Sequence, residues 1–321
     1  MHPAPAPRLP WDYSCRILRE NAGMRLDHFL VQALADYSRS EITRLIRAGA
    51  VQVNELTVKP GQRLRAGDCI TLTLPEQRSE LPLPRDIPIS VLYEDASILV
   101  IDKPAGLVVH PGEGHRQDTL VNGLLYRYDN LPGNDPLRPG IVHRLDKDTS
   151  GVLVIAKKHS ALKYVNAAFK NREIRKTYHA ILLRSPGQSQ GRVVAPIGRH
   201  PVKRQKMAVR QTGGRYAATR WKVLQSWPGF SLVEIDLETG RTHQIRVHMA
   251  SLGAPVAGDI LYGGKIREIA GIPVTRQLLH ASTISFTHPE TGRTLCSTAP
   301  LPTDMRQIIE GLDNVQEQDT R

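Results

Sequence analysis

The sequence predicts an α+β protein with a small N-terminal α/β module and a larger mixed domain. Near the N-terminus, apolar residues recur at the spacing of amphipathic helices, and beyond residue 87 apolar runs typical of strands outnumber helical stretches. The sequence has no regular alternation of strands and helices with a glycine-rich phosphate loop, which argues against a dinucleotide-binding fold.

The N-terminal module is expected to span residues 15–75, after a disordered, proline-rich segment of residues 1–14. Its first helix is predicted from Leu26, Leu30 and Leu34, which recur at helical spacing.

A second helix is predicted over residues 38–48, because Ser38 precedes Glu41 in a capping-box pattern and Gly49 follows as a stop. Short strands are expected from residue 51 to 58 and near residue 72. The second helix carries three arginines, Arg39, Arg44 and Arg47. A solvent-exposed face is the ordinary explanation for them, and contact with RNA phosphates is the alternative.

The larger domain is expected over residues 87–306, between a linker at 76–86 and a flexible polar tail at 307–321. Three apolar runs predict strands in it: ILVI at 98–101, VLVI at 152–155 and LVEIDL at 232–237.

Composition indicates a soluble protein with a polyanionic partner. Among 321 residues, 40% are hydrophobic, and no apolar run approaches the roughly 20 residues of a membrane helix. Lysine and arginine number 43 against 31 aspartates and glutamates, which gives a formal charge of +12. We therefore expect nucleic acid as the partner and no membrane association; a generally basic protein is the alternative.

The N-terminus and the cysteines predict a cytoplasmic protein. The N-terminus lacks both the apolar stretch of a secretory signal and the character of a transit peptide. Cys15, Cys69 and Cys296 lie far apart, so we expect neither a disulfide framework nor a thiolate zinc site.

The densest group of chemically active side chains lies in GIVHRLDKDTSGVLVIAK, residues 140–157. His143, Arg144, Asp146 and Asp148 fall between two apolar segments. Taken alone, this run is best explained as an exposed loop between strands.

The run HRLDKDTSG at 143–151 resembles the signature of the RluA family of pseudouridine synthases. DKPAG at 102–106, KTY at 176–178 and ETGRTHQIRVH at 238–248 agree with that family in order and spacing. The N-terminal module resembles the RNA-binding domain first described in ribosomal protein S-four, through RLD at 25–27 and GAVQVN at 49–54. The basic insertion at 196–209 is most similar to the RluD type within the family.

The resemblance implies a mainly antiparallel catalytic sheet and an enzyme that isomerises specific uridines in large-subunit (23S) ribosomal RNA. The reaction cuts the bond from C1′ to N1, turns a flipped-out uracil and rebuilds the bond at C5. It implies no cofactor and no metal, and a substrate within pre-ribosomal particles. Nothing in the sequence suggests an obligate interface, so we expect a monomer.

By resemblance, Asp146 is the catalytic carboxylate and Arg246 the cation that pairs with it. A carboxylate suits this chemistry because it can trap an oxocarbenium-like sugar or take a sugar proton. Tyr178 would stack on the uracil and take the C5 proton. Without the resemblance, Arg246 would be a surface arginine and Tyr178 a packing residue.

Three further residues take substrate roles by resemblance. Arg144 would fill the place of the flipped base, with an ion pair to Asp148 as the alternative, and Ile245 and Leu237 would wall the uracil.

A basic run covers residues 199–222, with eight lysines and arginines and no acidic residue. Phosphate binding is expected there, and a solvated face is the alternative. The RNA-binding residues predicted in this run are Lys203, Arg204, Lys206 and Arg210.

Two other functions fit parts of the sequence. Residues 146–149, DKDT, fit the D-x-D-x-T pattern of Mg²⁺-dependent aspartyl phosphatases, but GDILYG at 258–263 lacks a second metal-binding carboxylate. A non-catalytic RNA-binding assembly factor would need only the small module and the basic run. The histidines form no H-E-x-x-H set, so no zinc is expected.

Overall fold

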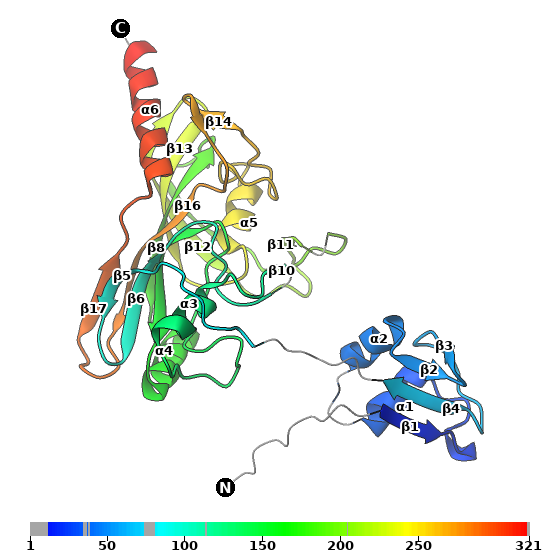
Figure 1. Ribbon diagram of the computed structural model, residues 1–321. Helices are drawn as coiled ribbons and strands as arrows, with labels where there is room; N and C mark the ends of the chain where they lie inside the picture. Colours follow the sequence, from blue (N-terminus) through cyan, green and yellow to red (C-terminus); the bar gives the residue numbers. More distant parts are fainter. Residues whose placement is uncertain are drawn as a thin grey trace. The chain divides into compact units, whose positions relative to one another are not determined.

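A computed structural model divides the protein into two compact units, residues 1–79 and 80–321 (Figure 1). It describes residues 12–34, 37, 39–73, 81–112, 114–203 and 205–319. The predicted cap Ser38, Arg204, and parts of the predicted N-terminal segment and linker lie outside the described residues.

The first unit is a four-stranded antiparallel sheet, in the order β1-β4-β2-β3, with two helices. The strands are β1 (Asp12–Arg16), β2 (Val51–Val53), β3 (Leu56–Thr57) and β4 (Cys69–Thr73), and the helices are α1 (Leu26–Ala33) and α2 (Arg39–Arg47). Leu26, Leu30 and Ile42 from the helices share one core with Ile70 and Leu72 of the sheet. α1 is thus held by the apolar spacing that predicted it, and α2, which was predicted from its cap and stop residues, also buries one apolar face.

The expected disorder of residues 1–14 is wrong for residues 12–14, which belong to β1. This strand pairs antiparallel with β4, with Tyr13 opposite Leu72. A short edge strand held by long-range pairing is weakly indicated by its own sequence. The proline-rich residues before β1 therefore led to a prediction of disorder.

The second unit is built on a nine-stranded mixed sheet in the order β5-β6-β7-β16-β8-β13-β12-β9, with β17 also paired to β16. Its strands are β5 (Ser90–Glu94), β6 (Ile98–Lys103), β7 (Ser150–Ala156), β8 (Arg175–Leu183), β9 (Gln190–Val194), β12 (Ala218–Trp227), β13 (Phe230–Leu237), β16 (Leu279–Thr287) and β17 (Thr294–Thr298). All pairs are antiparallel except β7 with β16. The predicted α+β class and the three predicted strands are confirmed.

Helices cover both faces of this sheet (Figure 1). They are α3 (Leu120–Arg127), α4 (His159–Asn171), α5 (Gln244–Ser251) and α6 (Thr303–Asp319). On β6, Leu99 and Ile101 face the core that contains residues of α3 and α5, whereas Ile98 and Val100 face the core that contains residues of α4. This alternation is the period-2 pattern of a strand buried on both faces.

The flexible tail predicted for residues 307–321 is corrected by α6, which continues to Asp319 (Figure 1). Met305, Ile308 and Leu312 are buried in one core with Trp227 of β12. Their spacing places them on one apolar face of a helix whose sequence is otherwise polar. Tertiary packing of this face, rather than the composition of the segment, stabilises the helix.

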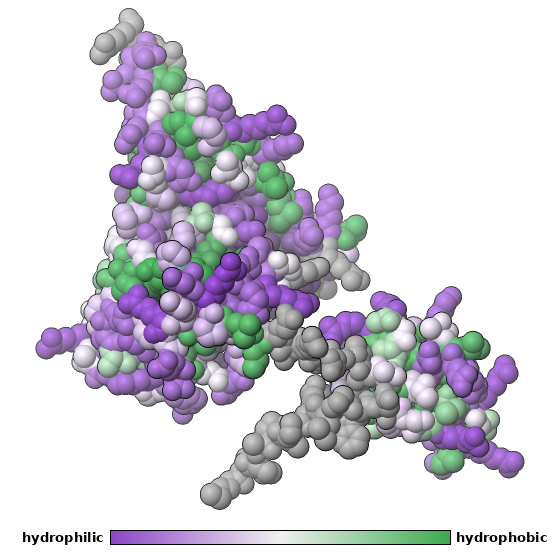
Figure 2. Space-filling model, in the orientation of Figure 1, coloured by the Kyte–Doolittle hydropathy of each residue, from purple (hydrophilic) through white to green (hydrophobic). Residues whose placement is uncertain are grey.

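Two small hairpins complete the second unit: β10 (Ile197–Arg199) with β11 (Met207–Val209), and β14 (Glu268–Ile269) with β15 (Ile272–Pro273). Among the described residues, no helix combines the length and apolar composition needed to cross a membrane. On the face seen in Figure 2, hydrophilic side chains predominate, with apolar ones interspersed.

The loop that carries Asp146 runs directly into the central strand β7. Gly151 at the start of this strand has φ +112°, and a Cβ there would lie 2.1 Å from the carbonyl oxygen of Ala281 on β16. Only glycine permits this close approach, which sets the end of the loop against the sheet.

Candidate active site

A cavity of about 490 Å³ lies in the second unit where several segments meet. The loop of residues 142–149, the start of β8 and residues 237–246 line it. The structure therefore brings together all six predicted catalytic and substrate residues, among them Arg144, Asp146, Tyr178, Ile245 and Arg246. Leu237 lines the same cavity.

Asp146 is one end of a chain of three charged side chains. Arg246 donates from Nη1 to Asp146 Oδ2 at 3.0 Å. The same guanidinium donates to both oxygens of Asp259, from Nε at 2.6 Å and from Nη2 at 3.0 Å. Side-chain exposure rises along the chain, from 0% for Asp259 through 8% for Arg246 to 21% for Asp146. Asp146 is thus the carboxylate offered to the cavity.

Asp259 was missed by the sequence reasoning, which considered residues 258–263 only as a source of metal ligands. Besides Arg246, it accepts hydrogen bonds from the backbone N–H groups of Leu261 and Tyr262. Burial opposes the charge on Arg246, but the hydrogen bonds from Arg246 to Asp259 and the charge of Asp146 raise the pKa of the guanidinium above its ordinary value. The arginine is a permanent cation with one fixed orientation.

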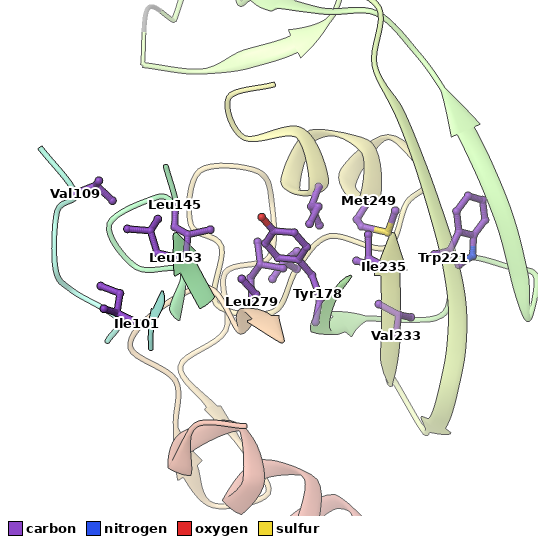
Figure 3. Packing of buried hydrophobic residues seen from close by; sticks show 14 of the residues in the cluster. Ile101, Val109, Leu145, Leu153, Tyr178, Trp221, Val233, Ile235, Met249 and Leu279 are labelled. Atoms are coloured by element: carbon purple, nitrogen blue, oxygen red, sulfur yellow. The ribbon is translucent and has the colours of Figure 1, made fainter. Parts of the chain in front are cut away.

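Tyr178 lies on β8 in the core beside the cavity, and Figure 3 shows it in the same packed cluster as Leu145 and Leu279. Burial and the nearby charge of Asp146 raise the pKa of its hydroxyl above the ordinary value. The phenol is therefore protonated near neutral pH. A protonated phenol is a weak base, which favours stacking over the removal of a proton.

Arg144 is exposed at the cavity, and its partner was not predicted. Its Nη1 donates to His110 Nε2 at 3.0 Å, while His110 Nδ1 donates to the carbonyl of Pro111. Burial lowers the pKa of His110, which suits a neutral ring that accepts from an arginine. Arg144 and Asp148, both among the described residues, do not form the alternative ion pair.

Two buried side chains support the loop. Lys103 is fully buried and donates to the carbonyls of Pro104, Leu107 and Lys147 at 2.7 to 3.0 Å. His143 accepts the backbone N–H of Val154 at 2.9 Å. Both side chains tie the residues that flank Asp146 to neighbouring backbone, so they have structural roles.

Cations surround the cavity mouth. Five lysines and arginines line it besides Arg144 and Arg246: Lys170, Arg172, Lys176, Arg215 and Arg241. Burial, with Arg241 nearby, lowers the pKa of Lys176 to about 8. Apart from Asp146, the acidic residue in the lining is Glu238, which Arg192 and Arg220 neutralise. The cavity therefore attracts polyanions.

The predicted RNA-binding residues fall on both units. In the first unit, Arg44 and Arg47 are exposed on α2, and Arg39 donates to Asp27 at 3.3 Å while its side chain stays 60% exposed. In the second unit, Lys203, Lys206 and Arg210 belong to the hairpin of β10 and β11 and its flanks. Arg204 lies outside the described residues.

The basic run at 199–222 is not uncompensated along its whole length, as the sequence suggested. Arg220 pairs with Glu238 at 2.7 Å, and Lys222 stands opposite Glu234 across β12 and β13. Cross-strand neighbours supply acids that the local sequence lacks.

Among the described residues, no group of three histidine, cysteine or acidic side chains is arranged to hold a metal. Asp259, the acid nearest to Asp146 in this chain of charges, is saturated by Arg246. The arrangement offers one carboxylate, held by one guanidinium, in the lining of a basic cavity.

Comparison with known proteins identifies the family. The family model for RNA pseudouridylate synthase matches residues 97–251, and the model for the S4 domain matches residues 24–70. An uncharacterized RNA pseudouridine synthase of Bacillus subtilis, YlyB, is 42% identical over 91% of this chain and 95% of its own length. The ribosomal large subunit pseudouridine synthase D of Xanthomonas campestris is 42% identical over 91% of this chain and 89% of its own.

A solved structure agrees with these relatives. The human RNA pseudouridylate synthase domain containing 4 superposes with a TM-score of 0.54 at 28% identity, over 70% of this chain and 93% of the human one. The resemblance drawn from the sequence is confirmed, and the phosphatase and the non-catalytic assembly factor are set aside. The chain belongs to the RNA pseudouridylate synthase family, whose members isomerise uridine in RNA, and it carries an S4 domain.

Proposed function

We propose that this enzyme converts specific uridines of large-subunit ribosomal RNA into pseudouridine, with Asp146 as the catalytic carboxylate. The chain of Asp146, Arg246 and Asp259, of which the first two line a basic cavity, carries this proposal. Relatives at about 40% identity that are named ribosomal large subunit pseudouridine synthase D support the substrate class.

Asp146 acts on the ribose in this proposal. Arg246 and His243 both face Oδ2 of Asp146, at 3.0 and 3.8 Å, which leaves Oδ1 for the sugar. That oxygen attacks C1′ or takes a ribose proton as the bond to N1 breaks. The freed uracil then turns and bonds to C1′ through C5, as the carboxylate leaves C1′ or returns the proton to the ribose. The C5 proton leaves at the end, so its release reports each turnover.

The substrate base is held and replaced by named side chains. Tyr178, Ile245 and Leu237 form the apolar wall on which the flipped uracil stacks. Arg144 enters the vacated place in the RNA stack, and its hydrogen bond to His110 keeps it extended at the cavity mouth until RNA arrives.

RNA phosphates are bound outside the cavity. We assign this task to Arg39, Arg44 and Arg47 of the S4 domain, to Lys203, Lys206 and Arg210 at the hairpin, and to Arg204 of the same basic run. The enzyme acts as a cytoplasmic monomer on pre-ribosomal particles and needs no metal or cofactor.

Pseudouridine mapping of ribosomal RNA tests the proposal. Cells that lack the gene receive wild type, Asp146→Asn or the control Asp135→Asn, an exposed carboxylate outside the cavity. We expect specific large-subunit sites to disappear and to return with wild type and with Asp135→Asn only. Restoration by Asp146→Asn would refute the catalytic role, and an unchanged map would refute the substrate.

A further inference from the structure

A side chain outside the cavity lining joins the basic hairpin to the catalytic carboxylate. Tyr262 follows Asp259 in a tight loop, and its backbone N–H donates to Asp259 Oδ1 at 3.1 Å. Its ring faces the guanidinium of Arg246 at 5.1 Å and the ammonium of Lys206 at 5.8 Å. Tyr262 therefore contacts both the Asp146–Arg246–Asp259 chain and the hairpin of β10 and β11.

The hydroxyl of Tyr262 has two hydrogen-bond partners, and together they determine which of them receives its proton. It accepts the backbone N–H of Met207, in β11, at 2.7 Å. It also lies 2.8 Å from His243 Nδ1. Because the amide of Met207 can only donate, the hydroxyl proton is free for Nδ1, and a neutral His243 then carries its own proton on Nε2.

That Nε2 faces the catalytic carboxylate, 3.8 Å from Asp146 Oδ2. Burial lowers the pKa of His243, although Asp146 opposes the shift, so the neutral ring is the form present near neutral pH. His243 also has φ +56° at the N-cap of α5, a left-handed conformation that a non-glycine residue adopts only when its surroundings hold it.

We propose that Tyr262 and His243 are positioning residues that couple the seating of the β10–β11 hairpin on RNA to the orientation of Asp146. The proposal rests on the catalytic role proposed for Asp146. RNA phosphates that draw Lys206 and the hairpin backbone onto the substrate fix Met207, which fixes the Tyr262 hydroxyl and the ring of His243. With Arg246 bonded to Oδ2 and Nε2 of His243 facing the same oxygen at 3.8 Å, Oδ1 keeps one direction toward the ribose.

The consequence for kinetics is specific. The hydroxyl touches neither phosphate nor base in this arrangement, so its removal leaves RNA affinity intact. The reaction step slows, because the carboxylate samples more orientations. A residue that served only to hold the hairpin would instead change the affinity.

The test uses a large-subunit rRNA transcript labelled with tritium at C5 of uridine, with filter binding for Kd and tritium release for the single-turnover rate. For Tyr262→Phe we expect a Kd within about twofold of wild type and a rate about five- to tenfold lower, the effect of one hydrogen bond. Tyr93→Phe is the matched control, since its hydroxyl bonds to Asp95 outside the cavity. It should match wild type in both measurements.

Variants of His243 complete the test. His243→Gln still offers an acceptor to Tyr262 and a donor to Asp146, so it should be faster than His243→Ala. The double variant Tyr262→Phe with His243→Ala should be no slower than His243→Ala alone, because both changes break one connection.

Several outcomes separate the possibilities. A wild-type rate for Tyr262→Phe, an effect confined to Kd, or rate reductions that multiply in the double variant would overturn the proposed coupling. Should Tyr262→Phe unfold, the comparison of His243→Gln with His243→Ala decides, and equal rates for the two would count against the coupling. Activity of Asp146→Asn in the same assay would instead refute the catalytic role of Asp146, on which this inference rests.

Discussion

Replacing Asp259 by asparagine isolates the role of the buried end of the Asp146–Arg246–Asp259 chain. The substitution keeps the shape but removes the charge, and an asparagine oxygen accepts at most one of the two guanidinium bonds at 2.6 and 3.0 Å. Arg246, only 8% exposed, is left with less compensation. Breaking a buried ion pair from one side costs about 3 to 5 kcal/mol.

For the unit of residues 80–321, each kcal/mol moves the thermal midpoint by about 2 to 4 °C, so Asp259→Asn should lower it by about 6 to 20 °C. The activity should fall by about 10- to 100-fold below the melting range, because Arg246 no longer has a fixed orientation toward Asp146. Differential scanning calorimetry and tritium release from C5-labelled RNA measure the two effects.

Asp304→Asn is the matched control. Asp304 also holds an arginine through two bonds, but it is 37% exposed, and its partner Arg276 keeps carbonyl acceptors at Asp148, Gln277 and Leu279. We expect a destabilisation of about 1 kcal/mol or less and normal activity. If Asp259→Asn melts within about 2 °C of wild type and turns over normally, then Arg246 is oriented by something other than Asp259, and the reasoning fails.

Three further predictions follow from the site and its surroundings. Burial lowers the pKa of His143 from 6.5 to about 3, so the stability that its neutral ring contributes is complete above pH 6.5 and is lost as the pH falls toward 3. His143→Gln, which still accepts the N–H of Val154, should therefore show a smaller drop in thermal midpoint than wild type between about pH 7 and about pH 5 in a melting series; equal drops would contradict the buried neutral ring. Arg144→Ala should slow single turnover at least about tenfold on a paired stem but much less on an unpaired oligonucleotide, because only the stem requires a few kcal/mol for flipping; equal slowing would argue against base displacement. Lys203→Ala with Lys206→Ala should reduce the slope of log Kd against log salt by about 0.7 to 0.9 for each phosphate that the hairpin no longer neutralises, and an unchanged slope would remove the hairpin from the RNA interface.

Local patterns were enough for most of the fold. The strands around residues 98–101, 152–155 and 232–237 were predictable because uninterrupted or alternating apolar runs of this length have few other solutions. The first helix of the small module was predictable because its apolar residues repeat every three or four positions, and the second because a capping-box pattern precedes it and Gly49 follows it. In each case the pattern that predicts the element lies in the element's own sequence or directly beside it.

Other elements depend on partners far away in the sequence. β1 is defined by its pairing with β4, more than fifty residues later, and α6 by a core shared with β12. A short stretch of sequence around β1 or α6 does not reveal β4 or β12 as its partner. For the same reason the proline-rich start and the polar end of the chain were both assigned too little structure.

The site divides in the same way. The motifs located Asp146, Tyr178 and Arg246, which the structure places around one cavity. His110, which accepts from Arg144, and Asp259, which holds Arg246, were missed because nothing in their own neighbourhood indicates what they contact. The feature of the sequence that could have indicated Asp259 is its tight turn. In that turn the carboxylate accepts hydrogen bonds from two backbone N–H groups as well as from the guanidinium of Arg246.

The order of burial along the Asp146–Arg246–Asp259 chain explains why a second carboxylate is useful to the first. A single guanidinium facing Asp146 alone would satisfy the carboxylate strongly and reduce its readiness to attack a sugar. Asp259, fully buried, takes two of the three guanidinium bonds, and it leaves one N–H for Asp146. The three side chains then carry a net charge of −1, concentrated on the partner with 21% exposure. In the proposed mechanism, orientation and reactivity are thereby separated: the buried pair fixes where Asp146 points, and the excess negative charge stays on the carboxylate that would meet the ribose.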